Sequence, residues 1–398
     1  MSALPTPPQA APRPTYFPAL DGVRAILLVS VLLRHFNHIW GAENLLERLY
    51  LVLPNLAIPA LDVFFAMSGF LITGILVDTV RDPGYFRNFY LRRVLRILPP
   101  YYAFLAIWFL LLPLVPKFAG MATPWSEQAW YWLHAVNFRL VIVGQYLPEE
   151  RLYHLWSLAF EEQFYLLWPA VVYAVSRQTL LRICAGAFVG AFLFRLWVAL
   201  AGVNYEVGFV LLPGRLDPLA AGAAIAVLIR EPGWFDWLVA RSRVALAVTF
   251  TAMLALIAVR RSYLPNDPVI LTLGLTVSAV FAASVVGSVL RLDRGSPAGA
   301  ILLHPLTRRV GAFTYAAYIW HWPVEAMAMR LGFDPLALHA AFGIRIVGQL
   351  VYWATLFVAS VGMGALSWYA LEVHCLKLKR FFSYGGGTVR RARSGGDE

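Results

Sequence analysis

Long apolar segments recur along almost the whole sequence and limit what it can fold into. We place them near residues 19–40, 56–78, 99–119, 154–176, 180–201, 213–230, 244–260, 268–290, 310–331 and 343–371. Each is close to the roughly 20 residues that an α-helix needs to cross the hydrocarbon core of a bilayer. Inside a bilayer a segment must satisfy its own backbone hydrogen bonds, which a helix does. The sequence therefore predicts an all-α, polytopic membrane protein with about ten transmembrane helices.

Composition supports the membrane class and argues against a nucleic-acid-binding protein. Of the 398 residues, 60% are hydrophobic and 14% are charged, whereas about a quarter are charged in a typical soluble domain. The net charge of +11 could suggest nucleic acid, but the basic residues lie in short loops between apolar segments. The two cysteines, Cys184 and Cys375, define neither a disulfide framework nor a metal site. We expect no metal and no permanently bound cofactor.

The distribution of basic residues predicts the orientation of the chain in the bilayer. One set of segment ends carries 21 Lys and Arg, the opposite set carries 7, and five lie inside or at the edges of the segments. Cytoplasmic loops are enriched in Lys and Arg, so both termini are predicted to be cytoplasmic. We expect a disordered, Pro-rich tail at 1–15, one membrane domain at 16–375, and a basic, disordered cytoplasmic tail at 376–398.

The first apolar segment contains two polar side chains that cost free energy to bury. Arg24 and His35 are eleven residues apart in YFPALDGVRAILLVSVLLRHF. On a continuous helix they would share one face, about 16 Å apart along the axis. His38 should fall within about 40° of the same face. Such a face is more typical of a helix that lines a site than of one that contacts lipid.

A basic stretch, YLRRVLRILPPYY, begins in the predicted inner loop at 79–97 and places Arg93 and Arg96 on one face of a helical turn. We expect Pro99 and Pro100 to end that turn. The stretch can be a cytoplasmic anchor, which charge alone favours. It can also bind the phosphates of a cytosolic ligand, because guanidinium groups contact phosphate in a bidentate manner.

The predicted outer loop at 120–153 is rich in aromatic residues. It contains Trp125, Trp130, Tyr131, Trp132 and Tyr146, together with His134, Glu149 and Glu150. Such residues suit a sugar acceptor, although a belt at the lipid interface is their commoner use. In the segment that follows, HLWSLAFEEQFYLLWP, Glu161 and Glu162 point about 100° apart, so we expect at least one to be paired. We interpret the Ser68-Gly69 pair in the second segment chiefly as allowing close helix packing.

Six sequence motifs, taken together, resemble those of the acyltransferase-3 family of integral membrane O-acyltransferases. They are LDGVR with the Arg24–His35 spacing, FFAMSGFLI, RR-x-x-R-x-x-P, WSLAFEEQFYLLWP, RLDPLAAGAAIA and TYAAYIWHWPV. Each motif alone is weakly specific, but the six follow the family's order over nearly the whole chain. The resemblance implies about ten helices with both ends inside. Because a basic tail follows ALEVHCLKLKRFF, the chain resembles the stand-alone form, without the extracytoplasmic esterase-like domain of some members.

The resemblance also implies roles for individual residues. Arg24 and His35 match the family's Arg/Lys-x10-His pair, whose histidine is regarded as catalytic. Glu161 matches the acid of a family signature, and Arg93 and Arg96 match an Arg-x-x-Arg motif associated with use of the acyl donor. Other residues on family motifs could line the site or form buried ion pairs that join helices. These are Asp62, Ser68, Arg215, Asp217 and His321.

The function implied is a membrane O-acyltransferase in the inner (plasma) membrane of a bacterium. It would move an acyl group, expected to be acetyl, from cytosolic acyl-CoA to a hydroxyl of an extracytoplasmic or membrane-associated acceptor such as a cell-envelope saccharide. Transfer needs a base for the hydroxyl proton, and the unperturbed pKa of histidine suits that role. The sequence leaves open whether His35 is itself acylated or only removes the proton.

Other functions remain open at this stage. The acceptor could be a lipid-linked sugar, a small glycosylated metabolite or a lipid. The chain could also be a non-enzymatic transporter or flippase, or a structural membrane protein whose buried charges merely pair. No internal repeat is visible in the sequence, which argues against a transporter built from two related halves.

Overall fold

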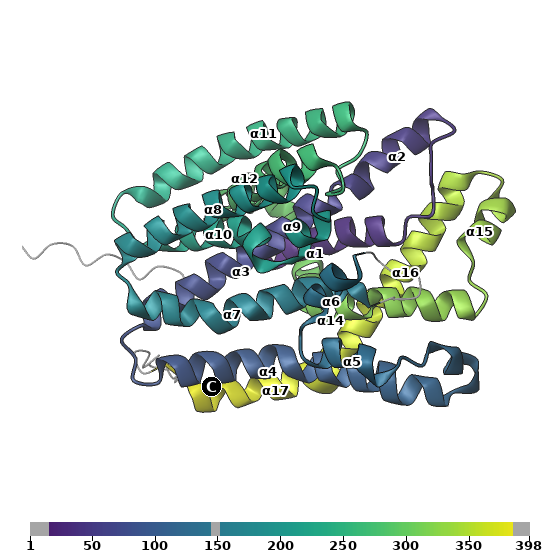
Figure 1. Ribbon diagram of the computed structural model, residues 1–398, viewed down its shortest axis with the longest axis horizontal. Helices are drawn as coiled ribbons and strands as arrows, with labels where there is room; N and C mark the ends of the chain where they lie inside the picture. Colours follow the sequence, from purple (N-terminus) through teal and green to yellow (C-terminus); the bar gives the residue numbers. More distant parts are fainter. Residues whose placement is uncertain (1–15, 145–151, 385–398) are drawn as a thin grey trace, which may run out of the picture.

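The computed structural model describes residues 16–144 and 152–384 as a bundle of helices (Figure 1), and no strand occurs in these two ranges. The longer helices are α1 (Pro18–His35), α2 (Leu45–Asn55), α3 (Ala57–Thr79), α4 (Tyr85–Ala106), α7 (Trp156–Ala174), α8 (Arg177–Leu200), α10 (Leu216–Leu228), α11 (Trp234–Arg260), α12 (Leu275–Val289), α14 (Pro305–Arg330) and α16 (Arg345–Ser367). The all-α prediction is confirmed. The predicted tail at 1–15 and residues 385–398 of the predicted C-terminal tail lie outside the described residues.

Shorter helices connect these elements or extend them. They are α5 (Trp125–Trp132), α6 (Val136–Val143), α9 (Tyr205–Val210), α13 (Pro297–Leu302), α15 (Pro335–Phe342), α17 (Val373–Lys377) and the 3₁₀ or π turns η1 (Ile107–Leu111), η2 (Leu112–Leu114), η3 (Pro116–Met121), η4 (Tyr153–Leu155), η5 (Leu212–Arg215), η6 (Ile270–Gly274), η7 (Trp368–Glu372) and η8 (Leu378–Phe382). Each of the ten predicted apolar segments overlaps one of the longer helices, although the segment at 99–119 shares only residues 99–106 with α4.

Six helical stretches of the described residues are long and apolar enough to cross a membrane. They are Leu45–Thr79, Tyr85–Leu114, Arg177–Leu200, Trp234–Arg260, Ile270–Val289 and Arg345–Phe382. The other four predicted segments contain α1, α7, α10 and α14, which are shorter or more polar. These four helices carry five of the ten candidate site residues, namely Arg24, His35, Glu161, Asp217 and His321. Polar side chains in a bilayer face the interior of a bundle. The total of about ten spans stays a prediction.

Helix α3 lies at the centre and packs closely against α10. A Cβ atom on Gly222 of α10 would lie 1.9 Å from the carbonyl oxygen of Ala66, and one on Gly69 of α3 would lie 2.0 Å from the carbonyl oxygen of Leu219. No side chain larger than hydrogen fits at such distances, so the two glycines allow the backbones to touch. The interpretation of the Ser68-Gly69 pair as a packing element is confirmed for the glycine.

Helices α1 and α14 are joined in the same way. A Cβ atom on Gly311 of α14 would lie 1.9 Å from the carbonyl oxygen of Asp21 in α1. Further along both helices, His321 contacts His35. The two helices therefore run side by side in the same direction, and this arrangement aligns the histidines of two distant segments.

The structure corrects the predicted end of the first helix. Helix α1 ends at His35, with Phe36 as its C-cap, so His38 does not continue the face of Arg24 and His35. The buried amide of Gln349 accounts for this end: it donates to the carbonyl of Phe36 at 2.7 Å and accepts from the backbone N–H of His38 at 2.9 Å. The imidazole of His38 instead lies 2.9 Å from Glu325.

The predicted inner loop at 79–97 is also wrong over most of its length. Helix α4 begins at Tyr85, and both Pro99 and Pro100 lie inside it instead of ending it. A proline inside a helix costs about 3 kcal/mol. Packing of α4 against α14 and the C-terminal turns η7, α17 and η8 offsets that cost, which could not be read from the local sequence.

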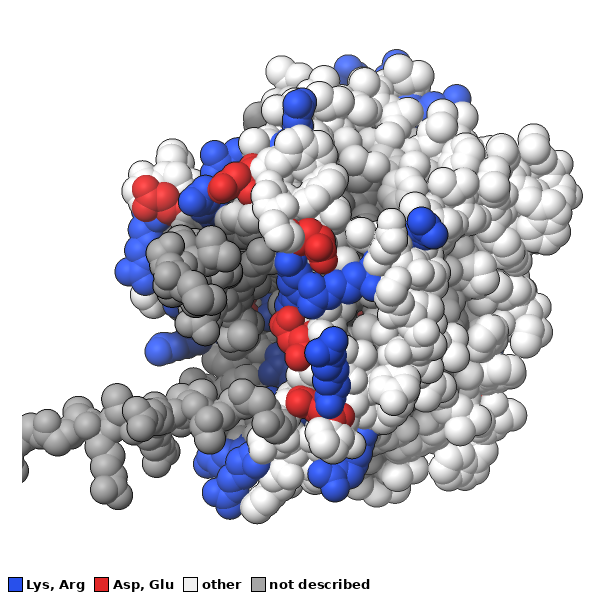
Figure 2. Space-filling model, turned by 90° about the vertical axis from the view of Figure 1, so that its left-hand side faces the viewer, with Lys and Arg blue, Asp and Glu red and all other residues white. Residues whose placement is uncertain are grey.

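One end of the bundle collects charged side chains. The starts of α4, α8 and α11 and the ends of α3, α7 and α10 lie toward the left in Figure 1. Figure 2, which looks at that side, shows Lys and Arg gathered there among acidic residues. The predicted cytoplasmic ends thus share one face, and the first and last described residues pack near its helix ends: Tyr16 accepts from Arg308, and Ser383 accepts from Asn88. That this face is cytoplasmic stays a prediction.

Candidate active site

Two adjoining cavities lie among the polar helices, and both are lined by Leu61 and Tyr318. The arginine cavity has a volume of about 150 Å³ and is lined by Arg24, Ser68, Arg93, Arg96, Glu161, Glu162, Tyr165, Thr314 and Tyr315, among others. The histidine cavity has a volume of about 310 Å³ and is lined by Arg34, His35, Tyr153, His154, Trp156, Tyr205, Phe209, Asn266 and Trp322, among others. The family's Arg24 and His35 therefore belong to two neighbouring chambers, as their separation along α1 predicts.

In the arginine cavity, Glu161 is held by two hydroxyl groups. Ser68 donates to its Oε1 at 2.9 Å, and Tyr165 donates to its Oε2 at 3.2 Å. Ser68 thus has a polar role in addition to the packing role of its glycine neighbour. Arg24 enters the same cavity and donates to Asp21 at 2.8 Å. Glu162, which the resemblance leaves aside, also lines this cavity.

Arg93 and Arg96 have no carboxylate partner among the residues that the structure describes. The guanidinium of Arg93 lies 4.1 Å from the ring centre of Tyr165, and that of Arg96 lies 5.5 Å from the ring centre of Trp368. Within the ranges 16–144 and 152–384, neither forms an ion pair. Aromatic faces thus support two guanidinium groups whose N–H donors are available to an anion.

In the histidine cavity, His35 is fixed by hydrogen bonding and stacking. Its Nδ1 lies 2.7 Å from Nε2 of His321, and Nδ1 of His321 lies 2.5 Å from the carbonyl oxygen of Tyr318. The ring of His35 also stacks on Trp322, with 4.3 Å between ring centres. The structure therefore joins two of the predicted residues, His35 and His321, across 286 positions of sequence.

Sequence reasoning missed three residues of this cavity. Arg34 precedes His35 and forms no ion pair with any residue that the structure describes, so an unpaired guanidinium lines this chamber. His154 and Trp322 lie within two of the motifs quoted above, HLWSLAFEEQFYLLWP and TYAAYIWHWPV. Their position in these motifs could have marked His154 and Trp322 as site residues. For Arg34 the sequence offered only a charge near the end of an apolar segment.

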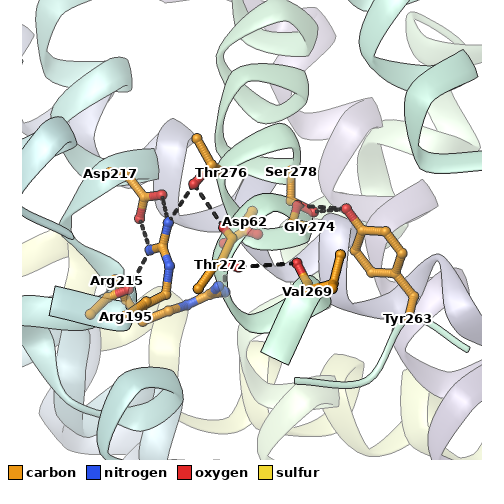
Figure 3. Close-up of polar contacts among 11 residues, drawn as sticks. Asp62, Arg195, Arg215, Asp217, Tyr263, Val269, Thr272, Gly274, Thr276 and Ser278 are labelled. Atoms are coloured by element: carbon orange, nitrogen blue, oxygen red, sulfur yellow. Dashed lines mark hydrogen bonds and ion pairs between the residues drawn. The ribbon is translucent and has the colours of Figure 1, made fainter. Parts of the chain in front are cut away.

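Asp62, Arg215 and Asp217 form buried ion pairs and line neither of these two cavities. Arg215 lies 2.5 Å from Asp62, and Arg195 donates to both carboxylate oxygens of Asp217 at 2.9 and 2.8 Å (Figure 3). All four side chains are at most 1% exposed. Of the two interpretations offered for these residues, the geometry matches ion pairs that join helices; Arg195 was not predicted as a partner.

The aromatic residues predicted for an acceptor in the outer loop mostly pack against the bundle. Trp132 stacks on Tyr102, and His134 stacks on Tyr101 with 4.1 Å between ring centres. Burial lowers the pKa of His134 to about 4. Trp125 is exposed, and Tyr146, Glu149 and Glu150 lie outside the described residues. Of the aromatic groups that line the histidine cavity, Tyr153 lies at the end of this loop and the others come from other segments.

A comparison with protein families identifies the class of the chain. The acyltransferase-domain family (acyltransferase 3) matches residues 17–371, so the chain belongs to this family of acyltransferases. The six long apolar helices support an integral membrane protein, and the family resemblance noted in the sequence is confirmed.

The chain is also similar to individual proteins that are named as peptidoglycan O-acetyltransferases. The chain is 28% identical over 371 residues to a putative peptidoglycan O-acetyltransferase, YrhL, of Bacillus subtilis, covering 85% of this chain and 51% of the relative. It is 22% identical over 325 residues to the peptidoglycan O-acetyltransferase OatA of Listeria monocytogenes, covering 78% of this chain and 49% of the relative. The chain thus spans about half the length of these relatives. No solved structure matches it significantly.

Proposed function

We propose that the chain is an O-acyltransferase of a bacterial inner membrane. It transfers an acyl group, in the first instance acetyl, from cytosolic acyl-CoA to a hydroxyl of a cell-envelope saccharide on the opposite side. The observation that supports this most is the pair of adjoining cavities, with unpaired arginines in one and a fixed histidine in the other. The relatives named as peptidoglycan O-acetyltransferases support a cell-envelope acceptor.

The arginine cavity suits the donor. Arg93 and Arg96 offer two guanidinium groups on one face of α4, and phosphate groups are bound by this geometry. Coenzyme A is polyphosphorylated and cytosolic, so its phosphates would meet these arginines at the basic face of the bundle. Its flexible arm would then carry the thioester past Tyr318 toward His35, over the distance of about 16 Å that separates Arg24 and His35 along α1.

The histidine cavity suits the transfer itself. The acceptor hydroxyl gives its proton to His35 as its oxygen attacks the thioester carbonyl, forming the new C–O bond. The C–S bond then breaks, and the sulfur takes the proton from His35 as the thiol leaves. Arg34 provides positive charge for the oxyanion that develops on the carbonyl oxygen. Tyr153, Tyr205 and Trp322 provide aromatic faces on which a sugar ring can rest.

The test compares two histidine variants of the purified protein in nanodiscs with acetyl-CoA and a soluble fragment of envelope glycan, read by mass spectrometry. We expect H35A to lose about 10²–10⁴ in rate, as removal of a general base typically does. The control is H374A, since His374 is exposed on α17 and forms none of the site's contacts. If H35A matches H374A in rate, His35 is not the base.

The same assay tests the class of reaction and the acceptor. One outcome is that the wild-type protein yields no acyl-CoA-dependent product on glycans or lipids extracted from the envelope and still moves a lipid-linked sugar across a vesicle membrane. In that case the chain is a flippase and the proposed function is wrong. A product on a lipid or on a small glycosylated metabolite instead of a polymer would keep the reaction and change the acceptor.

A further inference from the structure

Two hydrogen bonds link His35 to the backbone of α14 through His321. A carbonyl oxygen can only accept, so the contact of 2.5 Å between Nδ1 of His321 and the carbonyl of Tyr318 requires that Nδ1 carry the proton. A neutral imidazole has one N–H and one lone pair. The other nitrogen of His321, Nε2, therefore has a lone pair available when the ring is neutral.

The surroundings of His321 favour the neutral ring. Its side chain is 0% exposed, and the rings of His35, Phe36, His154, Tyr318 and Trp322 lie around it. No carboxylate among the described residues lies within ion-pair distance of it. Burying an unpaired charge in such a place costs far more free energy than burying a neutral ring.

The lone pair of His321 then sets the state of His35. At 2.7 Å, Nε2 of His321 accepts a hydrogen bond, so Nδ1 of His35 must donate it and carry the proton. That leaves Nε2 of His35 without a proton. Within the described residues this nitrogen has no hydrogen-bond partner, and His35 lines the histidine cavity.

We propose that His321 is a positioning residue that holds His35 in the Nδ1–H tautomer, so that Nε2 of His35 is the reactive nitrogen. The inference rests on the proposed function for its chemical meaning, because Nε2 is the atom that takes the acceptor's proton. His321 has no free lone pair in this arrangement and cannot itself be the base. His154 is not the base in this arrangement, since its Nε2 donates to the carbonyl of Ile319 at 3.2 Å and its Nδ1 is a buried atom.

The first test is spectroscopic and needs no activity. Nitrogen-15 NMR of histidine-labelled protein in nanodiscs separates protonated from bare ring nitrogens, and the His35 signals are assigned by their loss in H35Q. We expect Nδ1 of His35 to be protonated and Nε2 to be bare at neutral pH. A wild-type spectrum with the proton on Nε2 of His35 overturns the inference, whether or not the protein transfers acyl groups.

The second test uses two replacements of similar size. In H321Q the amide oxygen can accept from Nδ1 of His35, whereas in H321M no acceptor remains. We expect kcat of H321M to fall about 5- to 150-fold, the effect of leaving one buried hydrogen-bonding group unpaired, with KM for acetyl-CoA unchanged. H321Q should recover much of that loss and restore the Nδ1–H signal.

These outcomes separate the inference from the proposed function. If H321M keeps the wild-type kcat, or if H321Q is no better than H321M, His321 does not position His35. If the wild-type protein has no transferase activity but shows the Nδ1–H tautomer, the proposed function fails and the tautomer assignment stands.

Discussion

Asp217 provides the sharpest test of what holds the interior together. Its carboxylate receives two hydrogen bonds from Arg195 in a pair that is at most 1% exposed. Replacing it with alanine would leave the guanidinium buried with only the carbonyl of Gly214 and the hydroxyl of Thr276 as partners. Breaking a buried pair in this way costs about 3–5 kcal/mol. We therefore expect D217A to lower the free energy of unfolding by about that amount.

A double variant tests the physical reason. In R195M/D217L both charges are gone. The carbonyl of Gly214 loses its donor, whereas the hydroxyl of Thr276, which also loses Arg195, still donates to the carbonyl of Thr272. An unpaired buried carbonyl costs about 1–3 kcal/mol. The double variant should thus be more stable than D217A.

The assay is reversible unfolding in mixed micelles by titration with SDS, followed by tryptophan fluorescence. The control is D236A, which removes a pair with Arg291 in which the two side chains are 68% and 76% exposed. Such a pair contributes less than about 1 kcal/mol. The reasoning is refuted if D217A is as mild as D236A, or if the double variant is no more stable than D217A. Because Asp217 lines neither cavity, folded D217A should also keep the wild-type KM for acetyl-CoA.

Three further predictions concern orientation and substrates. The first uses a chain whose native cysteines are replaced and an impermeant thiol reagent added from outside. The reagent should label a cysteine at position 130 and not one at position 87. The reverse pattern would overturn the assignment of donor and acceptor sides. R93A and R96A should each raise the KM for acetyl-CoA about 10- to 100-fold, since a charge-assisted hydrogen bond contributes about 1.5–3 kcal/mol. Lysine at either position should restore only part of the lost affinity for acetyl-CoA. If the KM for acetyl-CoA is unchanged in both alanine variants, the two arginines serve only as topological signals. R34A should lower kcat about 10²–10³-fold with little effect on the KM for acetyl-CoA, as loss of an oxyanion donor does. If R34A instead keeps the wild-type kcat and raises the KM for the acceptor, Arg34 binds the acceptor.

Segment length and hydropathy predicted the helices well, because one-dimensional patterns decide whether a segment can cross a bilayer. The exact ends were less accessible. Helix α1 ends where the side chain of Gln349, more than three hundred residues away, bonds its last turn. Likewise α4 continues through Pro99 and Pro100 because other helices pack on it. Both errors arise from tertiary contacts that no local pattern records.

In the candidate site, too, local sequence predicted some residues, whereas others depend on tertiary contacts. The spacing of Arg24 and His35 on one helix, and the motif around Glu161, placed these residues in the interior without a structure. The partners of His35 and Asp217 come from α14 and α8, and only the packing of helices reveals them. Arg34 was not predicted as a site residue, because a charge near the end of an apolar segment commonly contacts lipid headgroups. Its position in the histidine cavity depends on which way α1 is rotated.

The residues shared by the two cavities matter for a protein in the proposed membrane. Leu61 and Tyr318 border both chambers, so these two side chains lie where the chambers adjoin. In the bacterial inner membrane that we propose for this chain, energy is stored as a proton gradient, and a continuous file of water through the protein would discharge that gradient. The proposed passage of an acyl group would then have to occur without both chambers filling with water at once. The bulk of these two side chains would be needed to keep the membrane closed to protons.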